Sequence, residues 1–279
     1  MPPIVVLVII GLIAGLTGGM LGVGGSIVMI PAMTELLGPD QHLYQAAAMI
    51  VNLFVVIPAV VHHRRAKAID PSTIRRLIPF AMVGVVVGVA ISETPLFVGE
   101  GERYLRGMFG LFLLAVGAID LYRLARDKVR FGVRLPPPYG SDPTNCARPT
   151  MGWRFAAAVA LPTGLVAGLL GVGGGVLAVP LQRRFLGIPI RNAIANSATL
   201  IIATALVGAT LKNIALIRGH DYGYRSFALA GALIPAAVLG SMIGSRLTHL
   251  LPVKAIKTAF FILLVVAAGR LILGAVRGG

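Results

Sequence analysis

The stretch LGVGGSIVMIP, residues 21 to 31, returns later in the chain as LGVGGGVLAVP, residues 170 to 180. Six of the eleven positions are identical (Leu, Gly, Val, Gly, Gly and Pro), and the two copies stand 149 residues apart. The likeness continues beyond the glycines, because LRGMFGLFLLAVGA at 105 to 118 resembles IKTAFFILLVVAAG at 256 to 269. An internal duplication is the simplest explanation, so the sequence predicts two related halves.

Both copies lie within long apolar runs. The 279 residues are 57% hydrophobic and 13% charged, with a mean hydropathy of +0.88, whereas soluble domains are about 25% charged. Many runs approach the ~20 residues that cross a bilayer. The start, MPPIVVLVIIGLIAGL, has neither a basic region nor a cleavage site, so it reads as a membrane helix and not as a signal peptide. We therefore expect an all-α integral membrane protein.

Ten apolar segments follow one another, five in each half. They are 4–21, 22–37, 43–61, 77–92 and 104–122, then 153–170, 171–187, 192–211, 226–247 and 255–276. A polar stretch rich in basic residues and proline separates the two series. We assign residues 1–125 to a first transmembrane repeat, 126–151 to a cytoplasmic linker and 152–279 to a second transmembrane repeat.

Charge predicts the orientation of the segments. The loops at 62–76, 183–191 and 246–257, together with the linker and its flanks, hold 18 of the 25 Lys and Arg residues. Alternating crossings put all four regions on one side, which the positive-inside rule identifies as cytoplasmic. These basic cytoplasmic loops also explain the net charge of +15. Since no zinc-finger spacing or aromatic-basic platform is present, we expect no nucleic-acid partner.

An odd number of segments in each half makes the second half enter the membrane from the opposite side. The two repeats are therefore expected to have inverted topology. The sequence leaves open whether the first two segments of each half cross fully or form a broken or re-entrant hairpin, giving eight to ten transmembrane segments. A helix over 22–37 would be roughly 24 Å long at ~1.5 Å per residue, which is short for a hydrocarbon core of ~30 Å.

The duplicated glycines have two interpretations. Small residues four apart allow close helix packing, which we expect of Gly11, Gly15, Gly84, Gly88, Gly164, Gly168, Gly240 and Gly244. Short hydrophobic segments interrupted by Gly and Pro, at matching places in inverted repeats, instead indicate a transporter's substrate site. Helices beginning near Val23 and Val172 would direct unpaired N–H groups towards the centre, where they would suit an anion.

Polar residues within the apolar segments extend this candidate site. Unpaired amides and hydroxyls are costly in lipid, so they should face a wet cavity or bond to neighbouring helices, and the sequence does not choose between the two. The candidate substrate-binding residues are Gly22, Gly24, Gly25, Ser26, Asn52, Gly171, Gly173, Gly174, Gly175, Asn196, Ser197 and Thr199. We expect no catalytic residue, cofactor or metal, and the lone Cys146 excludes a multi-thiolate metal site and an internal disulfide.

The paired glycine motifs, the stretch at 195–199, the five-plus-five layout and the length together make the chain similar to the TauE/SafE family of sulfite and organosulfur anion transporters. The resemblance implies an inner-membrane permease for sulfite, a sulfonate such as sulfoacetate, or a related anion. From the family, only the glycine motifs and residues 195–199 are carried over. The first half departs from this pattern, with Ala47, Ala48 and Met49 where the second has Asn196, Ser197 and Ala198.

The expected function is thus a secondary transporter that moves a small anion by alternating access, with an anion channel of the same lining as the alternative. An enzyme is disfavoured because the sequence has no HExxH pair, no GxSxG elbow and no paired carboxylates within the apolar segments. Every Asp and Glu falls near a segment end or in a loop, so proton coupling has no obvious carrier. The expected partners are an anionic solute and the lipid bilayer, and the many small residues allow a homodimer without requiring one.

Overall fold

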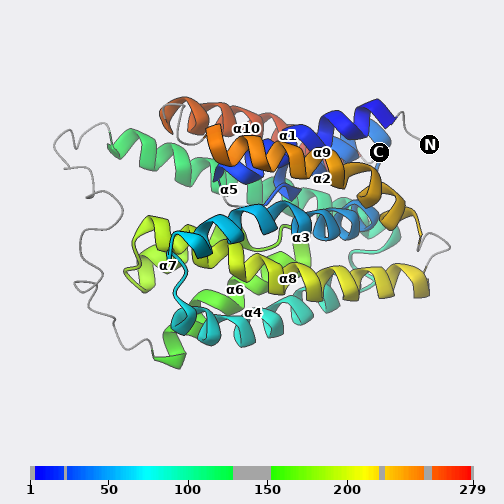
Figure 1. Ribbon diagram of the computed structural model, residues 1–279. Coiled ribbons are helices and arrows are strands. Elements are labelled where there is room, and N and C mark those ends of the chain that lie inside the picture. The colour runs from blue at the N-terminus through cyan, green and yellow to red at the C-terminus, as the bar shows by residue number, and fades with distance from the viewer. Residues whose placement is uncertain (1–3, 22–23, 128–151, 220–223, 248–252, 278–279) are drawn as a thin grey trace.

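A computed structural model describes residues 4–21, 24–127, 152–219, 224–247 and 253–277. Within these ranges the chain forms ten α-helices and one short 3-10 turn (Figure 1). In chain order these are α1 Ile4–Leu21, α2 Ser26–Leu37, α3 Gln41–Arg65, α4 Pro71–Ser92, η1 Gly99–Gly101, α5 Glu102–Asp127, α6 Trp153–Leu170, α7 Gly175–Phe185, α8 Ile190–Gly219, α9 Arg225–Leu247 and α10 Val253–Arg277. The all-helical prediction is confirmed, and each predicted segment overlaps one helix.

Two differences from the predicted segments matter for the site. Gly24, Gly25 and residues 171–174 precede α2 and α7, so these helices begin three residues after the starts expected near Val23 and Val172. The third segment of the second half, expected to end at 211, continues as α8 to Gly219. Most of the predicted linker, residues 128–151, lies outside the described residues.

Helix length separates two kinds of segment. Among the described residues, five stretches are long and apolar enough to cross a membrane: Gln41–Arg65, Pro71–Ser92, Trp153–Leu170, Asn192–Gly219 and Arg225–Gly244. α1 and α10 contribute shorter apolar stretches. α2 and α7 have 12 and 11 residues, which at ~1.5 Å per residue makes each less than about 20 Å long. Neither short helix spans a ~30 Å core by itself.

The largest helix contacts come as a matched pair, α1 with α9 and α4 with α6. A Cβ atom built on Gly15 of α1 would lie 1.9 Å from the Ala237 carbonyl oxygen of α9, and one built on Gly164 of α6 would lie 2.0 Å from the Ala81 carbonyl oxygen of α4. Gly15 and Gly164 hold equivalent positions in the two halves. In each half, the first helix therefore packs in the same way against the fourth helix of the other half. The packing role predicted for these glycines is confirmed.

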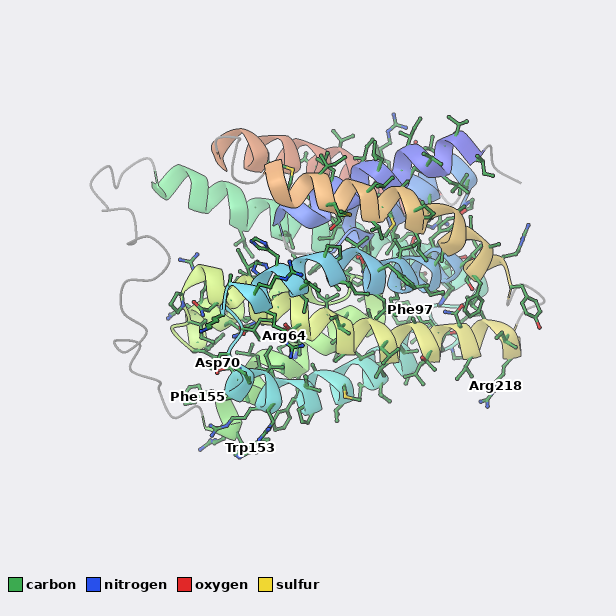
Figure 2. All side chains as sticks on the ribbon, in the orientation of Figure 1. Arg64, Asp70, Phe97, Trp153, Phe155 and Arg218 are labelled. Carbon is green, nitrogen blue, oxygen red and sulfur yellow. The ribbon has the colours of Figure 1, made fainter. Side chains whose placement is uncertain are left out.

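The helices lie side by side along a common direction (Figure 1). α3 and α8 pack against each other at the centre, α3 against α9 and α4 against α8. The colour gradient shows that α3 and α8 run in opposite directions, and the labelled Arg64 of α3 and Arg218 of α8 lie towards opposite ends of the molecule (Figure 2). The third helices of the two halves are therefore antiparallel.

The glycine contacts predict where an added methyl group is harmful. Gly164→Ala would press a Cβ against the Ala81 carbonyl, so we expect it to lower the free energy of unfolding by about 1–3 kcal/mol. Thermal unfolding of the detergent-purified protein measures this. The control is Gly231→Ala in α9, where an added Cβ would meet nothing within 4 Å. Equal melting temperatures for the two variants would contradict the packing role.

Candidate functional site

The two glycine motifs form tight turns that lead into α2 and α7. Gly24 has a φ of +84° and Gly173 a φ of +72°, values that side chains with a Cβ rarely adopt. Gly25 and Gly174 then occupy the N-cap positions of α2 and α7. Glycine is thus required by the backbone conformation at these turns as well as by close packing.

Asn52 of α3 lies between the two turns. Its Oδ1 accepts a hydrogen bond of 2.9 Å from the Gly25 N–H, and its Nδ2 donates one of 3.0 Å to Ser26 Oγ. A Cβ built on Gly24 would stand 3.0 Å from Asn52 Oδ1, and one built on Gly173 would stand 3.1 Å from Asn52 Nδ2. The side chain is fully buried. One carboxamide is therefore in reach of both turns, although the motifs are 149 residues apart in the sequence.

The second turn is held by hydroxyl groups of α8. Thr204 Oγ1 donates to the Gly173 carbonyl at 2.8 Å, and Ser197 Oγ donates to the Gly175 carbonyl at 3.2 Å. At the position that matches Asn52, α8 carries Ile201, whose Cγ2 would lie 3.3 Å from a Cβ on Gly173. Among the described residues, no side chain accepts a hydrogen bond from the first N–H groups of α7. The turn before these donors lies close to Asn52, because a Cβ built on Gly173 would stand 3.1 Å from Asn52 Nδ2.

The remaining predicted site residues lie elsewhere. Asn196 Oδ1 accepts from the Asp70 N–H at 2.9 Å, which ties α8 to the start of α4. The Thr199 hydroxyl donates at 3.0 Å to Ala195 O in its own helix. Gly171 ends α6 and packs against Gln45, where an added Cβ would meet the Gln45 Cβ at 2.7 Å. Gly22 falls outside the described residues.

The sequence analysis missed polar residues on the same helices. Thr204, noted above, was one, and Gln45 of α3 was another. The Gln45 side chain is fully buried, and within the described part of the chain neither its Nε2 nor its Oε1 has a hydrogen-bond partner. Gln45 and Asn52 are seven residues apart, a spacing that puts two side chains on one helix face, so this signal was present in the sequence.

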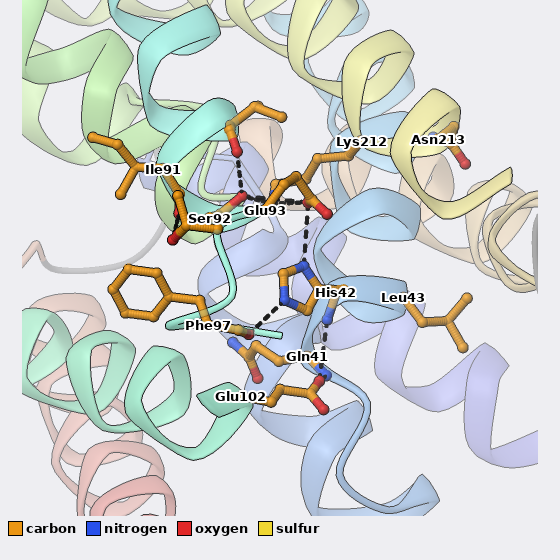
Figure 3. A network of polar contacts seen from close by, with 12 residues as sticks. Gln41, His42, Leu43, Ile91, Ser92, Glu93, Phe97, Glu102, Lys212 and Asn213 are labelled. Carbon is orange, nitrogen blue, oxygen red and sulfur yellow. Dashed lines mark hydrogen bonds and ion pairs between the residues drawn. The ribbon is translucent and has the colours of Figure 1, made fainter. Parts of the chain in front are cut away.

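A charged network joins α3, α4, α5 and α8 at the end of the molecule where α3 begins (Figure 3). Lys212 of α8 is 1% exposed, and its Nζ donates to Ser92 Oγ at 2.9 Å and lies 3.8 Å from Glu93 Oε1. His42 Nδ1 lies 3.3 Å from the same carboxylate oxygen. Glu102 accepts from the backbone N–H groups of Gln41 and His42. From hydropathy alone, the predicted apolar segment ended at residue 211, so Lys212 was expected in the loop that follows.

Glu93, just after the end of α4, is ionised more readily than an isolated glutamate. Burial opposes its charge, but hydrogen bonding with His42 and attraction to Lys212 outweigh that cost, so the pKa of Glu93 lies below its ordinary value. The network therefore favours the negative charge of Glu93 beside the buried Lys212. Within the described residues, no group of three or more His, Cys, Asp and Glu side chains could hold a metal ion.

The chain is similar to a known family of membrane proteins and to several probable membrane transporter proteins. The family model "Sulfite exporter TauE/SafE" matches residues 7–271. The probable membrane transporter protein MamO of Paramagnetospirillum magneticum is 28% identical over 276 residues, which are 92% of this chain and 42% of MamO. The probable membrane transporter protein YunE of Bacillus subtilis is 26% identical over 281 residues, 96% of this chain and 97% of YunE.

A MamO protein of Magnetospirillum gryphiswaldense is also similar, at 28% identity over 267 residues. The chain spans about two fifths of the length of the two MamO proteins and nearly the whole of YunE. No solved structure matches the chain. Because the family model covers almost all of the sequence, the chain is a multi-pass membrane protein and not an enzyme, and it belongs to the TauE/SafE family of sulfite exporters.

Proposed function

We propose that this protein is a secondary transporter of a small anion, most simply a sulfur oxyanion such as sulfite or a sulfonate such as sulfoacetate. The observation that carries the proposal is the meeting of the two glycine turns at Asn52, deep inside the protein. Backbone N–H groups at two helix starts, and no carboxylate bonded to either turn among the described residues, suit an anion. The family supports the substrate class.

The donors of the two turns have different roles in this proposal. The Gly25 N–H is already bonded to Asn52, whereas the first N–H groups of α7 have no side-chain acceptor among the described residues. An anion would therefore bind first at the α7 turn. The Asn52 Nδ2, which lies near Gly173, would turn from Ser26 to donate to it.

Alternating access follows from the pairing of the helices. The exchanged glycine contacts and the antiparallel α3 and α8 support two inverted repeats, at 1–125 and 152–279, joined by a cytoplasmic linker. In each repeat the first helix and its short successor would form a broken hairpin that reaches the bilayer centre. Since α1 packs on α9 and α6 on α4, the units that rock would be α1–α3 with α9 and α6–α8 with α4. Their shared boundary is the contact between α3 and α8.

Charge supports the placement in the cell. Arg64 and Arg65 lie in the last turn of α3 and Lys67 follows it, and Arg183 and Arg184 lie in the last turn of α7. Under the positive-inside rule this end faces the cytoplasm of an inner, plasma membrane. The charged network of Lys212 and Glu93 would then face the opposite compartment.

A change of charge at Asn52 tests the site. Asn52→Asp keeps the shape and the acceptor for the Gly25 N–H but adds a negative charge. A charge about 4 Å from a bound anion costs about 4 kcal/mol at an effective dielectric of 20. We therefore expect anion affinity, measured by thermal shift against sulfite, to fall at least about 100-fold. Asn52→Ala is the control for the loss of the side chain alone.

Asn52→Ala should weaken binding less than Asn52→Asp, since it removes a hydrogen bond without adding repulsion. If both variants stay folded and bind sulfite as tightly as the parent, the glycine turns are not the anion site.

Exchange kinetics separate a transporter from a channel. In proteoliposomes preloaded with unlabelled sulfite, we expect the uptake of radiolabelled sulfite to saturate and to run faster than in empty vesicles, because a carrier returns more readily when loaded. Protein-free vesicles give the background, and preloading with chloride or sulfoacetate tests selectivity. Uptake that rises linearly with concentration and ignores internal sulfite would favour the anion channel instead.

A further inference from the structure

We propose that Lys212 is a second anion site, an access site on the side opposite the cytoplasmic loops, where the transported oxyanion pairs with the buried ammonium before it reaches the glycine turns. This inference rests on the proposed function and adds a residue and a path to it. In this inference the full positive charge of Lys212 attracts the anion, whereas the glycine turns offer only the partial charges of helix N-termini.

Burying the charge of Lys212 inside the protein costs free energy, which suggests a functional role for this residue. Its side chain is 1% exposed, the lowest value of any described Lys or Arg side chain, and the nearest in burial is Arg106 at 9%. A charged group inside a membrane-spanning helix costs several kcal/mol and usually marks a pathway for an ion or a substrate. Lys212 lies seven residues before the end of α8, with helix on both sides.

The counter-charge of Lys212 is loosely held. Its hydrogen bond goes to the neutral Ser92 hydroxyl at 2.9 Å, while the Glu93 carboxylate oxygen is 3.8 Å away. That same oxygen lies nearer to His42, at 3.3 Å, and the Glu93 side chain is 30% exposed. Figure 3 shows Lys212 reaching from α8 towards Glu93, which His42 approaches from α3. An arriving anion can therefore replace Glu93 at the ammonium while Glu93 keeps His42 as its partner.

A line of polar side chains leads from Lys212 to the glycine turns. On α8, Lys212 is eight residues from Thr204, about 12 Å along the axis, and Thr204 bonds Gly173. On α3, the buried Gln45 lies between His42 and Asn52 and has no partner for its amide within the described part. Gln45 thus offers a donor on the way.

Along this line, α3 and α8 pack closely where α8 has a glycine. Gly208 of α8 stands between Thr204 and Lys212, and an added Cβ there would lie 2.5 Å from Met49 Sδ of α3. Of the three heavy atoms nearest to this point, two belong to the flexible thioether of Met49 and the third is Cγ1 of Val85 in α4, at 3.4 Å. A methionine yields more readily than a branched side chain, which suits a path that opens and closes.

A structural role for Lys212 is the competing explanation. The ammonium also ties α8 to the end of α4, and its loss would loosen that contact. The two explanations differ for Glu93. If the pair is only a tie, removing either charge weakens the protein and its transport together. If Glu93 competes with the substrate for Lys212, removing Glu93 alone should strengthen anion binding.

The test is sulfite uptake into proteoliposomes by the parent protein, Lys212→Gln, Lys212→Arg and Glu93→Gln. We expect Lys212→Gln to raise the KM for sulfite by at least about tenfold, the worth of one charge-assisted hydrogen bond. Lys212→Arg should keep most of the affinity, and Glu93→Gln should lower the KM. The matched control is Arg218→Gln, which removes an exposed charge from the same helix and should leave KM unchanged.

A double variant, Lys212→Gln with Glu93→Gln, covers the case in which the single variants fold poorly, because it leaves neither charge unpaired. It should show the raised KM of Lys212→Gln. A parent-like KM in Lys212→Gln or in the double variant would overturn the access site, and so would a KM raised equally in Glu93→Gln. A parent protein that neither binds nor moves sulfite or other anions would instead reject the proposed function itself.

Discussion

Irregular backbone at the depth of the membrane must find its hydrogen bonds within the protein, because hydrocarbon offers none. In the proposed arrangement the two glycine turns are under this constraint, and side chains of α3 and α8 satisfy part of it. Asn52 accepts from the first turn, and Thr204 and Ser197 donate to carbonyls of the second. The helices that carry these side chains, α3 and α8, are consequently the two central ones. The short α2 and α7 follow from the same turns, since each begins only after its glycines.

The two turns are alike in backbone but unlike in chemistry. The Asn52 amide hydrogen-bonds the first turn, whereas hydroxyl groups of α8 hydrogen-bond the second. Ile201 occupies the position in α8 that matches Asn52 in α3. In the proposed mechanism, the similar backbones of the two halves would allow two equivalent tilts around the centre. Because the side chains differ, a ligand at the proposed site would meet one set of donors, the α7 turn with the Asn52 amide, and not two copies of the same half-site.

The sequence predicted much of the fold, because hydropathy and small-residue spacing are local signals. The ten segments and the packing glycines could be found from these signals alone. The helix starts at Ser26 and Gly175 could not, because glycine permits both a helix and a turn, and tertiary contacts choose between them. The contact of Asn196 could not be predicted for a related reason, since its proximity to Ser197 in the sequence does not reveal that its Oδ1 accepts a hydrogen bond from the Asp70 N–H. Lys212 was not predicted to lie inside a helix, because a hydropathy profile ends an apolar segment at a charged residue. In the structure α8 continues past Lys212, whose charge is compensated by Ser92 and Glu93.

The exchanged packing of α1 on α9 and of α6 on α4 has a mechanical consequence. Backbone contacts as close as those at Gly15 and Gly164 leave no room for sliding, so each of these pairs should move as one body. In the proposed mechanism, motion would then be confined to the boundary between α3 and α8, where Gly208 of α8 lies against Met49 of α3. The flexible Met49 side chain thus lies between the buried Lys212 and the glycine turns, on the path proposed for the anion. Rigid helix pairs on the outside and a deformable contact between the central helices are what the proposed alternating access requires.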